Sequence, residues 1–130
     1  MRTIIKGLSI GLLALALAAC GEAVIPPTTS EVVLEHDDAA IFGTANVSAA
    51  AHVVTIDGAW EGPDIIEPGA GVHGPGADGP RLYALGFDNA ANTFGGSFTL
   101  PERHRPQFSA GELYIVLPTA EGDIVGQIVR

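Results

Sequence analysis

The chain has 130 residues, of which 15 are acidic, 6 are basic and 47% are hydrophobic, and its formal net charge is −9. This length suits one domain, and the apolar content excludes an acidic disordered chain. The negative charge argues against nucleic-acid binding, because such binding needs clustered Lys and Arg. The single cysteine excludes an internal disulfide and any CxxC metal or redox site.

The chain begins with the pattern of a bacterial secretion leader. Two basic residues, Arg2 and Lys6, precede a run of 13 almost wholly apolar residues at positions 7–19. A run of this length matches the hydrophobic region of a signal peptide and is too short for a membrane span of about 20 residues. It ends in the sequence LAAC at residues 17–20, which resembles the lipobox of bacterial lipoproteins.

The lipobox resemblance implies that residues 1–19 are a signal peptide and that Cys20 carries lipid. Two or three acyl chains hold a protein on a membrane stably, whereas a single chain does not. Gly21 follows the cysteine, and by resemblance this favours the outer membrane, facing the periplasm or the surface, over the inner membrane. The alternatives are an ordinary signal peptide with a chance cysteine and a short helical anchor. Residues 20–30 contain two prolines and predict a flexible tether before a domain over residues 31–130.

From about residue 31 the sequence has the periodicity of β-strands. Short runs rich in Val, Ile, Leu, Phe and Tyr alternate with Gly, Pro, Asn and Asp. These runs predict seven strands, at residues 32–35, 40–47, 52–57, 81–87, 93–100, 112–117 and 123–129. Turn residues between 88 and 92 predict a hairpin between the fourth and fifth strands. Seven short strands without a long amphipathic helix predict an all-β sandwich.

Three segments of this sandwich carry more specific predictions. Residues 113–117 are apolar on both faces, which places their strand inside a sheet. In the last strand Ile124 and Ile128 share one face with Gly126 between them, and the small glycine leaves room for a side chain from the opposite sheet. Residues 101–109 open like a helical turn, which we expect Pro106 to end early.

One long segment, residues 57–80, does not fit the strand pattern. It contains seven glycines and four prolines in 24 residues. Loops of this length are uncommon and are usually functional or disordered. This loop is therefore the predicted location of a binding site.

Four residues of the loop are candidate partner or ligand residues: Trp60, Asp64, His73 and Asp78. Trp60 would form an exposed patch with the isoleucines that follow it, or fill the core, as a lone Trp at a strand end more often does. His73 would be a remnant metal ligand or, more simply, a loop histidine bonded to a carboxylate or the backbone. The loop's five carboxylates suggest calcium, although no EF-hand or RTX pattern is present. The other histidines show no metal-ligand spacing, and His52 would approach His73 only if their segments pair.

The second half of the chain resembles a CHRD domain, the module named after chordin and also found in bacterial secreted proteins. The matching sequences are VHGP at residues 72–75, GPRLYAL at 79–85, FTLP at 98–101, AGELYIVLPT at 110–119 and GDIVGQI at 122–128. Their order and spacing together carry the resemblance, and the segments from residue 43 match more loosely.

The CHRD resemblance implies an immunoglobulin-like antiparallel β-sandwich with a faint similarity to Cu/Zn superoxide dismutases. The family's His-x-His element suggests a metal site, because alternate residues of a strand point the same way. Here Gly71 replaces the first histidine and Pro118 stands where a later histidine would be, so only His73 remains. These departures argue against a metal cofactor.

Together these features predict a lipid-anchored, extracytoplasmic binding or scaffolding module of the bacterial cell envelope, with no cofactor and no catalysis. Its predicted partners are the membrane, through the lipid on Cys20, and an envelope protein or glycan that the loop at residues 60–80 would contact. The alternative from another class is a metal-handling or redox-related protein with a degenerate histidine site. A third interpretation is a purely structural envelope component without a discrete site.

Overall fold

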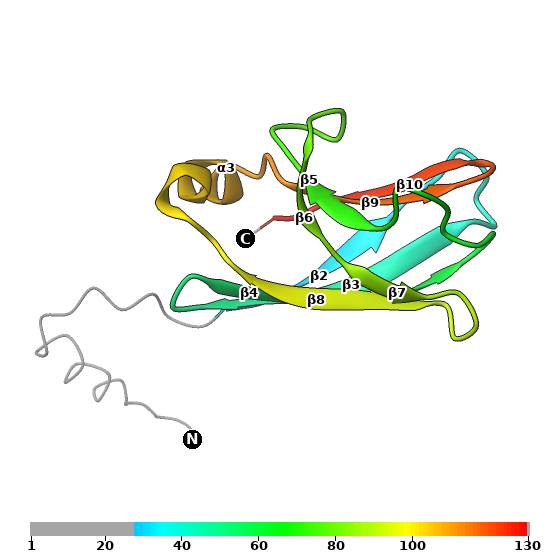
Figure 1. Ribbon diagram of the computed structural model, residues 1–130, viewed down its shortest axis with the longest axis horizontal. Coiled ribbons are helices and arrows are strands. Elements are labelled where there is room, and N and C mark those ends of the chain that lie inside the picture. The colour runs from blue at the N-terminus through cyan, green and yellow to red at the C-terminus, as the bar shows by residue number, and fades with distance from the viewer. Residues whose placement is uncertain (1–27, 130) are drawn as a thin grey trace, which may run out of the picture.

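The computed structural model describes residues 28–129, which form two antiparallel sheets packed face to face (Figure 1). The predicted all-β sandwich is confirmed. The predicted signal peptide, Cys20 and most of the predicted tether lie outside the described residues. Within residues 28–129 neither helical segment is long and apolar enough to span a membrane.

The larger sheet has five strands in the order β2-β3-β4-β8-β7. Its strands are β2 (Thr28–Leu34), β3 (Phe42–Ala50), β4 (Val53–Glu61), β8 (Thr93–Thr99) and β7 (Gly86–Asp88). Strands β7 and β8 form the predicted hairpin, in which Asp88 pairs with Thr93 across the turn. All neighbours in this sheet are antiparallel.

The smaller sheet has four strands in the order β10-β9-β5-β6. They are β10 (Gly122–Gln127), β9 (Tyr114–Thr119), β5 (Gly71–His73) and β6 (Arg81–Ala84). Strand β9 has neighbours on both sides, as its two apolar faces predict. Its residues Ile115 and Leu117, together with the preceding Leu113, are fully buried.

The core fills the space between the two sheets. Burial alternates along β3 and β4, so that Val47, Val54 and Ile56 point inward while their neighbours face solvent. Leu113, Ile115, Leu117, Ile124 and Ile128 meet them from the side of the smaller sheet. The alternation is the physical reason why short apolar runs in the sequence predict this architecture.

The two sheets approach closely where β2 meets β10. Glu35, just after β2, exchanges two backbone hydrogen bonds with Val125, at 2.8 and 3.0 Å. A Cβ on Gly126 would lie 2.8 Å from Cγ1 of Val32 and 2.9 Å from Cγ of Leu34. The prediction that Gly126 leaves room for side chains of the opposite sheet is therefore confirmed.

Several strand boundaries differ from the sequence prediction; β4, for example, continues to Glu61, four residues past the predicted end of its strand. The predicted strand 81–87 is two strands, β6 and β7, in different sheets, because the buried Leu85 turns inward and donates its N–H to the carbonyl of Ala70 at 3.0 Å. Strand β5 lies inside the predicted loop, where the fully buried Val72 pairs with both Tyr83 and Ile115. Strand β2 begins at Thr28, within the predicted tether.

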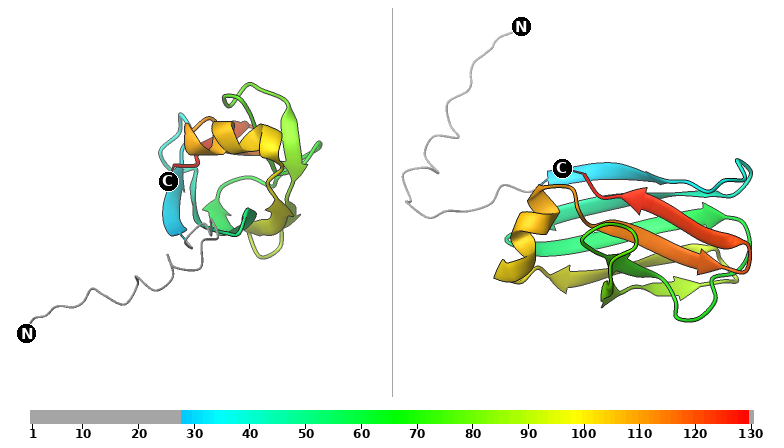
Figure 2. Two further views of the ribbon diagram at one scale, coloured as in Figure 1. Left: turned by 90° about the vertical axis from the view of Figure 1, so that its left-hand side faces the viewer. Right: turned by 90° about the horizontal axis from the view of Figure 1, so that it is seen from above.

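Two short helical segments close one end of the sandwich (Figure 2). The 3₁₀ turn η2 (Glu102–His104) leads into α3 (Arg105–Ser109). The expectation that Pro106 ends this turn is wrong, because Pro106 stands in the first turn of α3, where its missing N–H costs no hydrogen bond. The buried Phe108 holds α3 against the core.

Candidate functional site

The outer face of the five-stranded sheet carries a row of small polar side chains. Its strand register aligns four hydroxyl residues, Thr29, Ser48, Thr55 and Ser97, on β2, β3, β4 and β8. Adjacent strands lie about 4.8 Å apart, so these hydroxyls form a row across the sheet. The hydroxyls of Thr55 and Ser97 are hydrogen-bonded at 2.9 Å.

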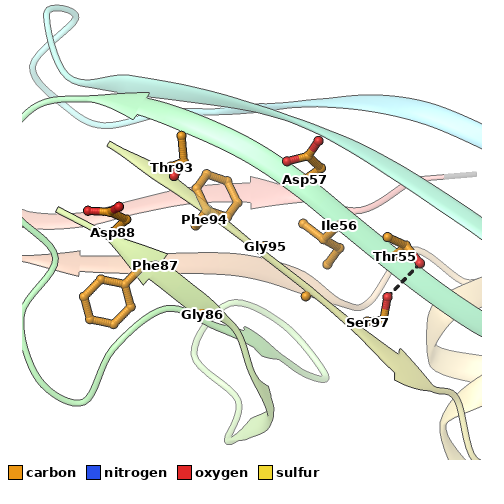
Figure 3. Close-up of a pocket in the computed structure, with 11 residues that line it drawn as sticks. Thr55, Ile56, Asp57, Gly86, Phe87, Asp88, Thr93, Phe94, Gly95 and Ser97 are labelled. Atoms are coloured by element: carbon orange, nitrogen blue, oxygen red, sulfur yellow. Dashed lines mark hydrogen bonds between the residues drawn. The ribbon is translucent and has the colours of Figure 1, made fainter. Parts of the chain in front are cut away.

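A shallow recess of about 550 Å³ opens on this face between β4, β8 and β7 (Figure 3). Gly86 and Gly95 are paired across β7 and β8 and contribute no side chains. A Cβ on Gly95 would lie 2.4 Å from the carbonyl oxygen of Ile56, so only glycine fits there. The recess exists because these two positions leave the sheet backbone uncovered.

Two carboxylates and a hydroxyl stand around the recess. Asp57, Thr93 and Asp88 come from β4, β8 and β7, and Figure 3 shows them along one side of the recess. Phe87 also borders the recess, but it pairs with the buried Phe94, so its ring points to the opposite face of the sheet. The site therefore offers acceptor oxygens to a ligand.

A second depression, of about 310 Å³, continues the first toward β2. Its lining adds Glu31 and Asn46 and shares Asp57 and Thr93 with the recess. We call the combined feature the sheet trough, and define it by Glu31, Asn46, Asp57, Asp88 and Thr93. It runs across the strands from one edge of the sheet to the other.

The sheet trough is acidic. Its three carboxylates are accompanied by no Lys, Arg or His among the described residues that line the two depressions. Ionised carboxylates are acceptors only, whereas an amide and hydroxyls both donate and accept. The trough therefore suits a ligand that presents hydroxyl or amine donors and repels an anionic one.

Trp60, the first of the predicted loop residues, is a core residue. It is 2% exposed, its Nε1–H donates to the carbonyl of Pro63 at 2.8 Å, and its ring lies 6.4 Å from that of Phe94. Ile65 is buried as well, and only Ile66 faces solvent. The interpretation of Trp60 as part of an exposed contact patch is wrong, and its alternative as a core residue is confirmed.

The other three predicted residues are not gathered into one site. Asp64 is exposed between β4 and β5, and Asp78 is exposed in the connection between β5 and β6. His73 ends β5 and is half-buried, with its Nδ1 2.9 Å from the carbonyl oxygen of Gly79. Because a carbonyl only accepts, Nδ1 carries the proton, and His73 ties the β5–β6 connection to its own strand.

The histidines do not form a cluster in the described part of the chain. His52 lies in the turn between β3 and β4 of the larger sheet, beside Arg105 and Phe108, whereas His73 belongs to the smaller sheet. Their segments do not pair. No group of three or more His, Cys, Asp or Glu side chains within residues 28–129 is arranged to hold a metal ion.

A polar pair that the sequence analysis missed links β6 to η2. The hydroxyl of Tyr83 lies 2.6 Å from Nδ1 of His104, and the Tyr83 ring stacks on Phe98 of β8 with centroids 3.9 Å apart. Burial raises the pKa of the Tyr83 phenol, and the positive charge of Arg103 opposes part of that rise. The cluster joins both sheets to the helical segment and so has a structural role.

The sheet trough was also missed from the sequence. Its five defining residues come from five strands, and the sequence around each of them is that of an ordinary solvent-facing strand residue. The signal that could have pointed to it is the series of small polar residues at alternate positions of β3 and β4, whose outward face carries few large side chains. Only the strand order shows that these positions adjoin Thr93 and Asp88.

Comparison of the chain with protein-family models, with curated proteins and with solved structures finds no match. The CHRD resemblance therefore stays a prediction.

Proposed function

We propose that this chain is a lipid-anchored, extracytoplasmic binding module of the bacterial cell envelope, without catalytic activity, and that it binds an envelope glycan in the sheet trough. The observation that carries the proposal is the sheet trough itself, an open acidic depression across the outer face of the larger sheet. The lipobox resemblance at Cys20 supports the location, and the CHRD resemblance supports an extracellular type of domain.

The chemistry of the trough favours a sugar chain that bears hydroxyls and amines. Asp57, Asp88 and Glu31 accept hydrogen bonds from such donors, and Asn46 and Thr93 both donate and accept. The shape supports the same class, because an open trough accommodates an extended chain, whereas small ligands are usually enclosed in a concave pocket.

Binding of amine-bearing oligosaccharides tests the proposal. We expect glucosamine oligomers to bind the detergent-solubilised, full-length protein more tightly than their N-acetylated counterparts, and the affinity to fall as salt is added. Asp57→Asn should weaken binding roughly 10-fold to 100-fold, since a hydrogen bond to a charged group contributes about 1.5–3 kcal/mol. Isothermal titration calorimetry measures both effects.

The matched control is Asp78→Asn, which removes one carboxylate from the exposed β5–β6 connection, outside the trough. It should leave the affinity unchanged. Equal losses in Asp57→Asn and Asp78→Asn would mean that net charge and not the trough attracts the sugar. Absence of binding to either class of oligosaccharide would contradict the glycan proposal.

Lipid attachment has a separate test. Cys20→Ser should abolish incorporation of labelled palmitate and leave the precursor at its unprocessed size, because no other thiol is present in the chain. A variant that still fractionates with membranes after a high-salt wash and runs at mature size would contradict the lipoprotein proposal.

A further inference from the structure

The two ends of the sandwich differ in charge. The end opposite α3 contains the β2–β3, β7–β8 and β9–β10 turns and the connection after β4, which lie together in Figures 1 and 2. Hydrogen bonds tie these segments to one another. Nε2 of His36 lies 2.8 Å from the backbone carbonyl oxygen of Glu121, and the N–H of Ile66 donates to the carbonyl of Pro118 at 2.9 Å. We call this the distal end. It carries nine carboxylates: Glu35, Asp37, Asp38, Glu61, Asp64, Glu67, Asp88, Glu121 and Asp123.

The opposite end, which we call the α3 end, carries most of the cationic groups. Of the three arginines in the described part of the chain, Arg103 and Arg105 lie here, in η2 and α3. His52 and His104 lie beside them, and the nearby carboxylates are Glu102 and Glu112. Arg103 is exposed, whereas the Nε–H of Arg105 donates to the carbonyl of Leu100 at 3.2 Å. The acidic surplus of the domain is therefore concentrated at one end.

The described chain also begins at the α3 end. Thr28 pairs with Ala49, next to the β3–β4 turn, and the carbonyl of His52 in that turn accepts the N–H of Leu100, which precedes η2, at 2.7 Å. Seven residues lie between Cys20 and Thr28, so the eight Cα-to-Cα steps span at most about 28 Å when fully extended. A lipid on Cys20 would therefore hold the α3 end near the bilayer.

We infer that the α3 end is a membrane-docking surface that rests on anionic lipid and directs the acidic distal end away from the bilayer. This inference depends on the proposed lipid attachment and adds an orientation to it. Arg103 and Arg105 would meet the lipid phosphates, and the exposed Val53 and Val129 lie at the same end. The sheet trough then lies along the side of the domain, open to the aqueous phase.

The domain is long enough for this orientation to keep the distal carboxylates away from the charge of the bilayer. A nine-residue strand such as β3 spans about 30 Å. The field of an anionic bilayer decays over about 8–10 Å at physiological ionic strength. In the docked orientation the distal carboxylates therefore lie outside that field, whereas the reverse orientation would bring nine of them against negative lipid.

Energy transfer to a bilayer dye tests the orientation. A donor dye is attached to a new thiol in Ala50→Cys, at the α3 end, or in Ala120→Cys, in the distal β9–β10 turn; both positions are exposed. The full-length protein is reconstituted into vesicles that carry an acceptor on the headgroups, made of phosphatidylcholine with or without phosphatidylglycerol. We expect strong transfer from position 50 and weak transfer from position 120, and a larger difference in the anionic vesicles.

Charge dependence separates docking from tethering alone. Arg103→Gln should lower the ratio of docked to undocked protein in anionic vesicles roughly fivefold, the factor that corresponds to about 1 kcal/mol per arginine at such a surface. Glu121→Gln, at the distal end, should leave the ratio unchanged. The same transfer in neutral and anionic vesicles, or the same ratio after Arg103→Gln, would overturn the inference.

Failure of the lipid attachment itself is recognised independently. Cys20 is the only native thiol, and a lipid on its sulfur protects it from a maleimide dye. If the protein without a new cysteine takes up dye, Cys20 is not lipidated and the proposed function loses its anchor. If it takes up no dye and the energy transfer is the same in neutral and anionic vesicles, the lipid attachment is supported and the proposed docking surface is wrong.

Discussion

Replacement of Gly126 by alanine tests the contact between the two sheets. A Cβ at this position would lie 2.8 Å from Cγ1 of Val32, 2.9 Å from Cγ of Leu34 and 2.9 Å from the carbonyl oxygen of Val33. All three distances are shorter than real Cβ contacts, and one partner is backbone, which a rotamer change cannot move away. Gly126→Ala should therefore force β2 and β10 apart.

The magnitude follows from two opposing effects. Overpacking in a core costs about 1–3 kcal/mol, whereas replacing glycine by alanine restricts the unfolded chain and returns about 0.4–1 kcal/mol. The net loss in the free energy of unfolding should be about 1–2 kcal/mol. For a domain of this size, that loss lowers the melting temperature by roughly 5–15 °C.

Gly86→Ala provides the matched control, because it makes the same chemical change in a strand where space is free. A Cβ on Gly86 would meet only the carbonyl oxygen of Gly95, at 3.6 Å, which is an ordinary contact. Its unfolding free energy should stay unchanged or rise by up to about 1 kcal/mol, because only the restriction of the unfolded chain applies. Thermal and urea denaturation of both variants measure the difference. If Gly126→Ala melts together with Gly86→Ala, the argument from the β2–β10 contact is refuted.

Three further predictions address the core and its polar groups. Ile128→Asp would bury an unpaired carboxylate at a position 1% exposed and should cost several kcal/mol in urea unfolding, whereas Gln127→Asp, on the exposed side, should cost much less; equal small losses would contradict the packing of this segment. Trp60→Ala should cost about 3–5 kcal/mol, and a loss below 1 kcal/mol would mean that the indole is not a core side chain. Burial raises the pKa of Tyr83, so the folded state binds its proton more tightly than the unfolded state. Stability should therefore be insensitive to this group below about pH 10 and fall as the pH rises through the raised pKa. Tyr83→Phe should flatten that alkaline fall in melts from about pH 8 to about pH 12, and an unchanged slope would contradict the assignment.

The sequence alone determined the features that follow from local alternation. A strand exposes successive side chains to opposite faces, so the apolar runs around Val54, Ile115 and Ile124 predict both the strands and the faces that they bury. The apolar content of both faces of β9 predicts its interior position, and the space above Gly126 follows from its place between Ile124 and Ile128. These inferences need only a few neighbouring residues and succeeded for that reason.

Tertiary structure decided the features that depend on which strands become neighbours. The three residues of β5 are too few to show a period, and Val72 marks a strand only because Ile115 and Tyr83 flank it. Leu85 divides one apolar run between two sheets because its side chain and N–H find partners in the core. In each case a distant partner, which the local pattern does not contain, sets the conformation.

The candidate surfaces have the same origin. Asp57 and Asp88 are 31 positions apart in the chain and come to line one recess only because β4, β8 and β7 are neighbours and because two paired glycines leave its floor open. The separation of charge between the distal end and the α3 end likewise arises from strands that bring four remote acidic turns together. Composition determined that the domain is acidic, and the strand order decided where that charge lies, because side chains from distant parts of the chain share a surface only after the sheets have formed.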